Sequence, residues 1–114
     1  MRTRSTLLLT GSLLFALSGL ASVHAAVDEA AAKALAKKND CFKCHAPEKT
    51  KKGPSLKKIA AKYKEKKLTE KDAIKRMTEG KKVKLEDGTE EDHKIIETKD
   101  PKELSNLAQW ILSH

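Results

Sequence analysis

The chain has 114 residues, of which 39% are hydrophobic and 35% are charged, and its formal net charge at pH 7 is +8. This length fits one small domain, and so highly charged a chain builds only a marginal hydrophobic core by itself. Arginine and aromatic residues are nearly absent from the basic stretches, which disfavours a nucleic-acid-binding surface.

Residues 1–25 have the layout of a secretory signal peptide. Arg2 and Arg4 precede an apolar segment that runs from Leu7 to Leu20, and Val23 and Ala25 stand at the −3 and −1 positions of a cleavage site. The apolar segment is shorter than the about 20 residues of a bilayer-spanning helix, so an uncleaved anchor is the less favoured alternative. Cleavage after Ala25 would leave one exported domain of 89 residues, from 26 to 114.

Two helices are predicted on either side of a loop in the first half of this domain. Residues 28–38 are rich in alanine and lysine, which are both good helix formers. Pro47 and the Gly53–Pro54 pair mark residues 45–54 as a loop. Ser55 is a suitable N-cap for a second helix that runs to about residue 64.

Two further helices are predicted in the second half, separated by an irregular segment. Thr69 is a good N-cap for the third helix, and Gly80 is placed to end it. The last helix begins after Asp100, with Pro101 at its first position and Glu103 completing a capping pattern. Residues 81–99 are the longest irregular stretch. No run of β-branched residues in the domain alternates for long enough to suggest a sheet, so the domain is expected to be all-α.

The only two cysteines and the following histidine form the motif Cys41-x-x-Cys44-His45. This is the attachment signature of c-type haem, in which the two thiols add to the haem vinyl groups and the imidazole binds the iron. A thioredoxin-like cysteine pair would need a βαβ context that the sequence lacks. A closed structural zinc site would need a fourth ligand.

With these features the chain resembles the short bacterial class I (monohaem) cytochromes c over residues 27–114. The Cys-x-x-Cys-His motif follows an N-terminal helix, a Gly53-Pro54-x-Leu56 segment comes next, and residues 107–113 look like the family's C-terminal helix. The resemblance implies about four helices around one covalent haem c, with thioether bonds at Cys41 and Cys44 and His45 as proximal ligand. It also implies that the Pro54 carbonyl accepts a hydrogen bond from the proximal imidazole.

The sixth iron ligand departs from the family pattern, which usually supplies a methionine from a proline-containing loop. Residues 81–99 contain neither methionine nor proline, but they contain His93. Three possibilities remain open: ligation by His93, ligation by Met77, or an open distal site. Met77 lies in a predicted helix, where methionine is more often a core residue. We favour His93, and hence an iron held by two histidines.

We therefore expect a periplasmic electron carrier, not an enzyme, that exchanges electrons with other redox proteins as a monomer. Residues 26–85 carry a net charge of +11 and residues 86–114 a net charge of −5, an asymmetry that orients a molecule towards an acidic partner. An alternative function is gas binding or sensing at an open or displaceable distal site. Six lysines near the motif are the expected docking charges: Lys43, Lys49, Lys51, Lys52, Lys57 and Lys58.

Overall fold

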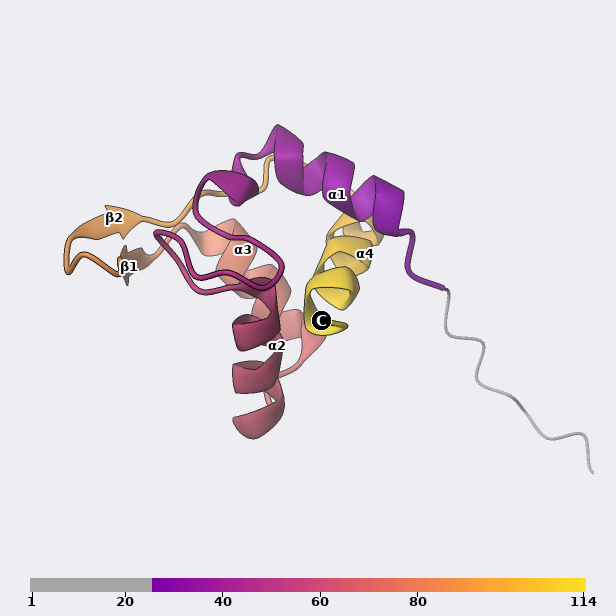
Figure 1. The fold of residues 1–114 in the computed structure, drawn as a ribbon. Coiled ribbons are helices and arrows are strands. Elements are labelled where there is room, and N and C mark those ends of the chain that lie inside the picture. The colour runs from indigo at the N-terminus through magenta and orange to yellow at the C-terminus, as the bar shows by residue number, and fades with distance from the viewer. Residues whose placement is uncertain (1–25) are drawn as a thin grey trace, which may run out of the picture.

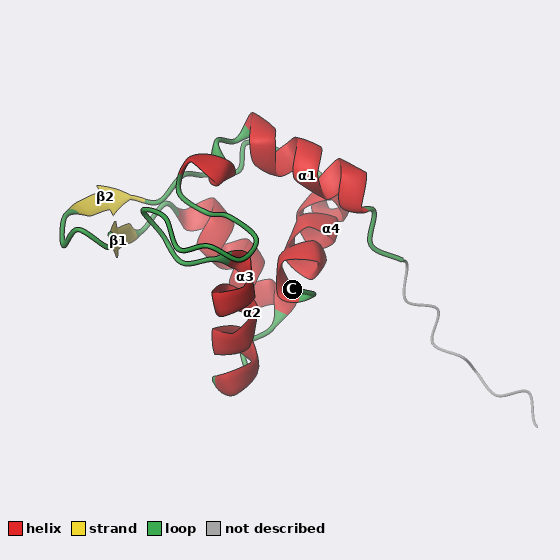
Figure 2. Ribbon diagram, viewed as in Figure 1, coloured by secondary structure: helices red, strands yellow, loops and turns green. Residues whose placement is uncertain are grey.

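A computed structural model describes residues 26–114, so the predicted signal peptide at 1–25 lies outside the described residues. Four helices form the body of the domain (Figures 1 and 2), which confirms the predicted fold class. They are α1 (Glu29–Lys38), α2 (Leu56–Glu65), α3 (Glu70–Glu79) and α4 (Pro101–Leu112), and a 3₁₀ turn spans Cys41–Lys43. Within residues 26–114, the helices are all too short or too polar to cross a bilayer.

Helices α2 and α4 begin directly after the predicted residues Ser55 and Asp100, and α1 begins after Asp28, for which no capping role was predicted. The side chain of Asp28 accepts a hydrogen bond from the Ala31 amide at 3.0 Å, and that of Ser55 accepts one from the Lys58 amide at 3.1 Å. The Asp100 carboxylate accepts one from the Lys102 amide at 2.9 Å. Each of these bonds satisfies one of the amides that the first turn of a helix leaves without a partner.

The role predicted for Glu103 in capping α4 was wrong. Its carboxylate accepts a hydrogen bond from the Thr98 hydroxyl, not from the Asp100 amide. The Asp100 amide in turn donates to Thr98 Oγ1 at 3.2 Å. The Thr98 hydroxyl therefore stands between the two groups that a capping box would pair directly.

Helix α4 is the centre of the core, because it packs against each of the other three helices. Its residues Leu107 and Ala108 are fully buried, and Trp110 is 5% exposed. The Phe42 ring, which belongs to the 3₁₀ turn, meets the Trp110 ring edge-on with 6.3 Å between centroids. The turn that carries the cysteines is thereby fixed to the core.

Residues 81–99, expected to be wholly irregular, contain a short antiparallel hairpin. Strand β1 (Lys82–Lys84) pairs with β2 (Glu90–Asp92), with Val83 opposite Glu91. Figure 2 shows the hairpin projecting from the helical body. The hairpin forms because of the turn that joins its strands. Gly88 adopts a positive φ of 86°, and the Thr89 amide donates to Asp87 Oδ1 at 2.9 Å. Strands of three residues held by such a turn need no long β pattern.

Candidate functional site

The two cysteines lie on one tight turn that directly follows α1. Asp40 adopts a left-handed conformation with φ 59°, which redirects the chain at the end of the helix. The amides of Cys44 and His45 both donate to the Cys41 carbonyl, at 3.2 and 3.0 Å. Both cysteine side chains are partly buried, and burial raises the pKa of the Cys41 thiol. The turn thus gathers two thiols and an imidazole within five consecutive residues.

The His45 ring is held by two adjacent residues of the following loop. Its Nδ1 lies 2.6 Å from the Pro54 carbonyl oxygen, so Nδ1–H donates a hydrogen bond to that oxygen and Nε2 keeps a free lone pair. Gly53 packs closely against the ring, since a Cβ atom at this residue would lie 2.9 Å from His45 Cε1 and 3.2 Å from Nδ1. The loop therefore fixes both the orientation and the free nitrogen of the imidazole.

His93 follows strand β2 and is held in a similar way. Its backbone amide donates to the Lys81 carbonyl at 3.0 Å, across the base of the hairpin. Its Nδ1 lies 2.9 Å from the Lys94 carbonyl oxygen, which again leaves Nε2 as the free nitrogen. Burial lowers the pKa of His93, and this favours the neutral imidazole, which is the form that binds metals.

The structure brings His45 and His93 together, although 47 residues separate them in the sequence. Their ring centroids lie 6.2 Å apart with 47° between the ring planes. Two imidazole nitrogens bound to opposite sides of one metal ion, at about 2 Å each, place their ring centroids roughly 6 Å apart. The spacing fits a pair of axial ligands.

Met77 lies in a different environment. Its side chain is 7% exposed and belongs to the hydrophobic core, together with Leu56, Ala73 and Trp110. Its carbonyl accepts a hydrogen bond from the Ile96 amide at 2.9 Å. Met77 thus has the surroundings of a core residue on a helix.

Histidine pairs alone do not make a site for a bare metal ion. Across the part of the chain that the structure describes, no group of three or more His, Cys, Asp or Glu side chains is arranged to hold one. A haem needs less from the protein, because the porphyrin itself provides the equatorial ligands and the chain supplies only the axial ones. Two thiols for attachment and two facing imidazoles form a donor set that fits this cofactor.

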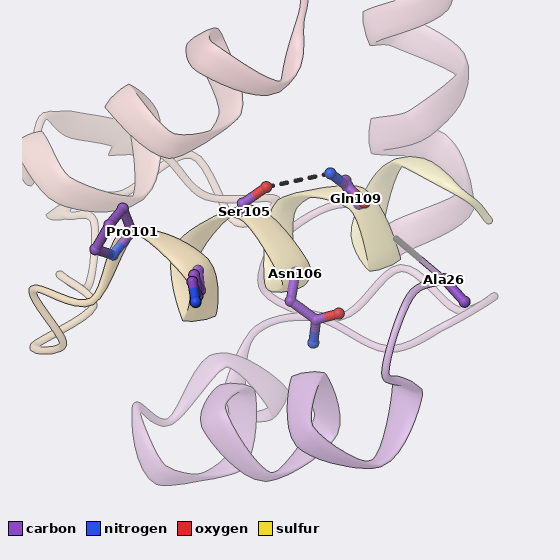
Figure 3. Close-up of a pocket in the computed structure, with 6 residues that line it drawn as sticks. Ala26, Pro101, Ser105, Asn106 and Gln109 are labelled. Atoms are coloured by element: carbon purple, nitrogen blue, oxygen red, sulfur yellow. Dashed lines mark hydrogen bonds between the residues drawn. The ribbon is translucent and has the colours of Figure 1, made fainter. Parts of the chain in front are cut away.

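One open surface hollow lies away from the attachment turn. It is bordered by Ala26 at the start of the described chain and by one face of α4 (Figure 3). Its lining residues are Ala26, Pro101, Lys102, Ser105, Asn106 and Gln109. None of the predicted site residues is among them, so the hollow is separate from the attachment turn.

Sequence reasoning missed several residues that support the site. Lys51, predicted as a docking charge, donates from Nζ to the Phe42 carbonyl within the attachment turn at 2.7 Å. Asn39, whose Oδ1 accepts a hydrogen bond from the Glu97 amide, was not singled out. Gly53 was named as a loop residue and as part of the Gly53-Pro54-x-Leu56 segment, but its contact with the His45 ring was not foreseen. Their closeness to the motif in the sequence was the available signal, but their partners become evident only in the fold.

The comparisons with known proteins agree with this site. The cytochrome c family profile matches residues 29–114. The class 1 cytochrome MtoD from Sideroxydans lithotrophicus ES-1 is similar, with 52% identity, a TM-score of 0.72, and coverage of 77% of this chain and 97% of MtoD. Cytochrome c552 from Nitrosomonas europaea shows 31% identity and a TM-score of 0.54, covering 71% of this chain and 96% of its own.

No curated protein sequence matches the chain. The family match nevertheless spans almost the whole described region, and the similarity to both cytochromes extends over more than two thirds of the chain. The chain therefore belongs to the cytochrome c family and is a haem-based electron carrier with covalently bound haem c.

Proposed function

We propose that this cytochrome is a periplasmic one-electron carrier whose haem iron is held between His45 and His93. The observation that carries the proposal is the 6.2 Å spacing of the two imidazole rings, each with its Nδ1 engaged by a backbone carbonyl. The haem, when bound, supplies reversible one-electron exchange between ferric and ferrous iron. Cys41 and Cys44 hold it covalently in this proposal.

The protein's own groups orient the two ligands. The Pro54 carbonyl accepts a hydrogen bond from His45 Nδ1–H, and this makes Nε2 of the same ring a stronger electron donor to a metal. The Lys94 carbonyl does the same for His93. With both axial positions filled by protein nitrogens, a substrate has no free position on the iron, which supports electron transfer over catalysis.

The identity of the distal ligand also bears on the reduction potential. Methionine–histidine ligation raises the potential of haem iron, so a second imidazole gives a lower value. Glu90, Glu91 and Asp92 are exposed residues immediately before His93, and their negative charges favour the ferric state. Solvent screening weakens both this effect and the opposite effect of the exposed lysines, so the identity of the distal ligand has the larger influence on the potential. We expect a lower potential than that of a methionine-ligated relative.

Docking to acidic periplasmic partners would use the six lysines near the attachment turn. Two of these lysines already have contacts: Lys43 lies 3.2 Å from Asp40, and Lys51 contacts the Phe42 carbonyl. Weak, fast-exchanging electrostatic encounters suit an electron carrier. Electron-transfer rates with partners should therefore fall as salt rises, and rates independent of salt would contradict the steering role.

Export and oligomeric state complete the proposal. Residues 1–25 act as a cleavable signal peptide, and the mature monomer begins at Ala26. The exported compartment is oxidising, so unattached Cys41 and Cys44 would tend to form a disulfide there. Intact mass measurement and size-exclusion chromatography of protein purified from the periplasm test these two points.

The deciding experiment compares three haem-loaded proteins by electron paramagnetic resonance and near-infrared magnetic circular dichroism. The unmodified protein and Met77→Leu, a volume-conserving control, should both show low-spin imidazole–imidazole ligation. His93→Ala should lose that signature. A thioether signature that Met77→Leu removes would assign the distal position to Met77. High-spin iron in the unmodified protein, with rapid CO binding, would instead favour gas binding or sensing.

A further inference from the structure

We propose that Asn39 is a positioning residue that keeps the distal ligand on the iron by anchoring residues 93–97, here called the distal segment. The inference rests on the proposed role of His93 as distal ligand. It assigns to a residue beside the proximal motif a function on the opposite side of the site. The carrying contact is the hydrogen bond from the Glu97 amide to Asn39 Oδ1, at 3.0 Å.

Asn39 is built into the end of α1. It is the C-cap residue of the helix and is 9% exposed, so its side-chain amide is mostly removed from water. Its Nδ2 donates to the Leu35 carbonyl at 2.9 Å, which fixes the direction of the side chain and points Oδ1 at Glu97. Because Asn39 stands two residues before Cys41, the anchor is continuous with the attachment turn.

The other anchors of the distal segment belong to the opposite part of the molecule. The Ile96 amide donates to the Met77 carbonyl on α3 at 2.9 Å, and Ile96 is 4% exposed. Ile95 lies against Gly80, where an added Cβ would come within 2.9 Å of Ile95 Cδ1. The distal segment is thus bridged between α3 on one side and Asn39 on the other.

A second contact between the same regions is weaker. Lys94 Nζ lies 3.8 Å from Asp40 Oδ2, and the two side chains are 61% and 43% exposed. Exposed ion pairs of this kind contribute little to stability. Asn39, buried and with both ends of its amide hydrogen-bonded, therefore makes the stronger of the two side-chain contacts that anchor the distal segment to the end of α1.

The physical consequence concerns how often His93 leaves the iron. Its departure requires the distal segment to move, and that movement breaks the Asn39–Glu97 hydrogen bond and leaves Oδ1 of the buried Asn39 without this partner. Without the Asn39 amide this cost is absent, so the distal position opens more often. Asn39 acts through the segment and not by contact with the iron.

The test measures CO association with the reduced, haem-loaded full chain, because CO binds only where the distal imidazole has left. The control variant is Asn106→Ala, which also removes a two-bond amide clamp: Asn106 Oδ1 accepts from the Asp28 amide and Nδ2 donates to the Asp28 carbonyl, both at 2.8 Å. Figure 3 shows Asn106 projecting from α4 towards α1, and both of its hydrogen bonds go to Asp28.

Asn39→Ala should raise the CO association rate about tenfold, equivalent to about 1.4 kcal/mol in the opening equilibrium. Asn106→Ala should leave the rate unchanged while lowering thermal stability. Equal rates in the two variants would overturn the inference, because loss of stability alone would then explain both. Asp40→Asn should have a smaller effect than Asn39→Ala.

His93→Ala separates failure of this inference from failure of the proposed function. If CO binds His93→Ala no faster than the unmodified protein, His93 is not the distal ligand and both ideas fail. If His93→Ala opens the site but Asn39→Ala matches the control, only the inference on Asn39 fails. Hydrogen exchange of the Glu97 amide is measured on the unmodified protein, so it remains a test even if a variant fails to fold or to bind haem. Slow exchange supports the anchor, and exchange at the rate of an unstructured amide overturns it.

Discussion

The two proposed sides of the haem site, with His45 proximal and His93 distal, are built in opposite ways. On the proximal side, Cys41, Cys44, His45, Gly53 and Pro54 lie within 14 consecutive residues, and their contacts are local. On the distal side, His93 is placed by a hairpin, and the residues after it are held by contacts to α1 and α3. A local turn is readily encoded by a motif, whereas the distal side depends on the assembled fold (Figure 1).

The largest expected effect is on the proximal side, where attachment is covalent. Replacing both Cys41 and Cys44 by alanine should abolish thioether bonding completely, because no other cysteine exists in the chain. Mass spectrometry of the denatured protein should then find it lighter by one haem. The Met77→Leu protein, carrying both thiols, should keep the haem mass. A double variant that still holds haem after denaturation would break the assignment.

On the distal side, a substitution should change the reduction potential of the haem and leave the thioether bonds at Cys41 and Cys44 unaffected. His93→Met should raise the reduction potential on the order of 100 mV, part of the about 0.8 V range that axial ligands span. Potentiometric titration of the unmodified protein and the variant measures this directly. An unchanged potential, with unchanged spectra, would mean that residue 93 does not bind the iron.

The fit of the His45 ring against the Gly53 backbone predicts a third effect. Gly53→Ala places a methyl group 2.9 Å from His45 Cε1, and overpacking of this kind costs about 1–3 kcal/mol. The ring should also turn, which shifts the electron paramagnetic resonance g values. Gly88→Ala is the matched control, because Gly88 has a positive φ of 86° but nothing within 4 Å of an added Cβ. Its g values should not change.

The contrast between local contacts and contacts between distant residues also explains which features could be predicted from the sequence. Helix bounds followed from capping residues such as Ser55 and Asp100, whose bonds are local in the chain. The β1–β2 hairpin was not foreseen, because strands of three residues are too short to show an alternating pattern. The Thr98–Glu103 hydrogen bond was not foreseen, because the sequence does not show which of several nearby donors a carboxylate will bind. The closeness of His93 to His45 was inferred from position in a family pattern, and Asn39 was missed because its partner Glu97 lies 58 residues away.

The smallest expected effect concerns the start of α3, the helix whose Met77 carbonyl anchors the distal segment. The Thr69 amide and hydroxyl donate to Asp72 Oδ2 at 2.7 and 2.9 Å, and these bonds lower the pKa of Asp72. A lowered folded-state pKa means that the carboxylate stabilises the fold above its unfolded pKa, and the contribution is lost as pH falls through the folded value. Urea unfolding of the unmodified protein and Asp72→Asn should therefore differ at pH 7 and converge under acidic conditions. A difference that persisted unchanged at pH 2 would show that the charge on Asp72 is not what stabilises this end of α3.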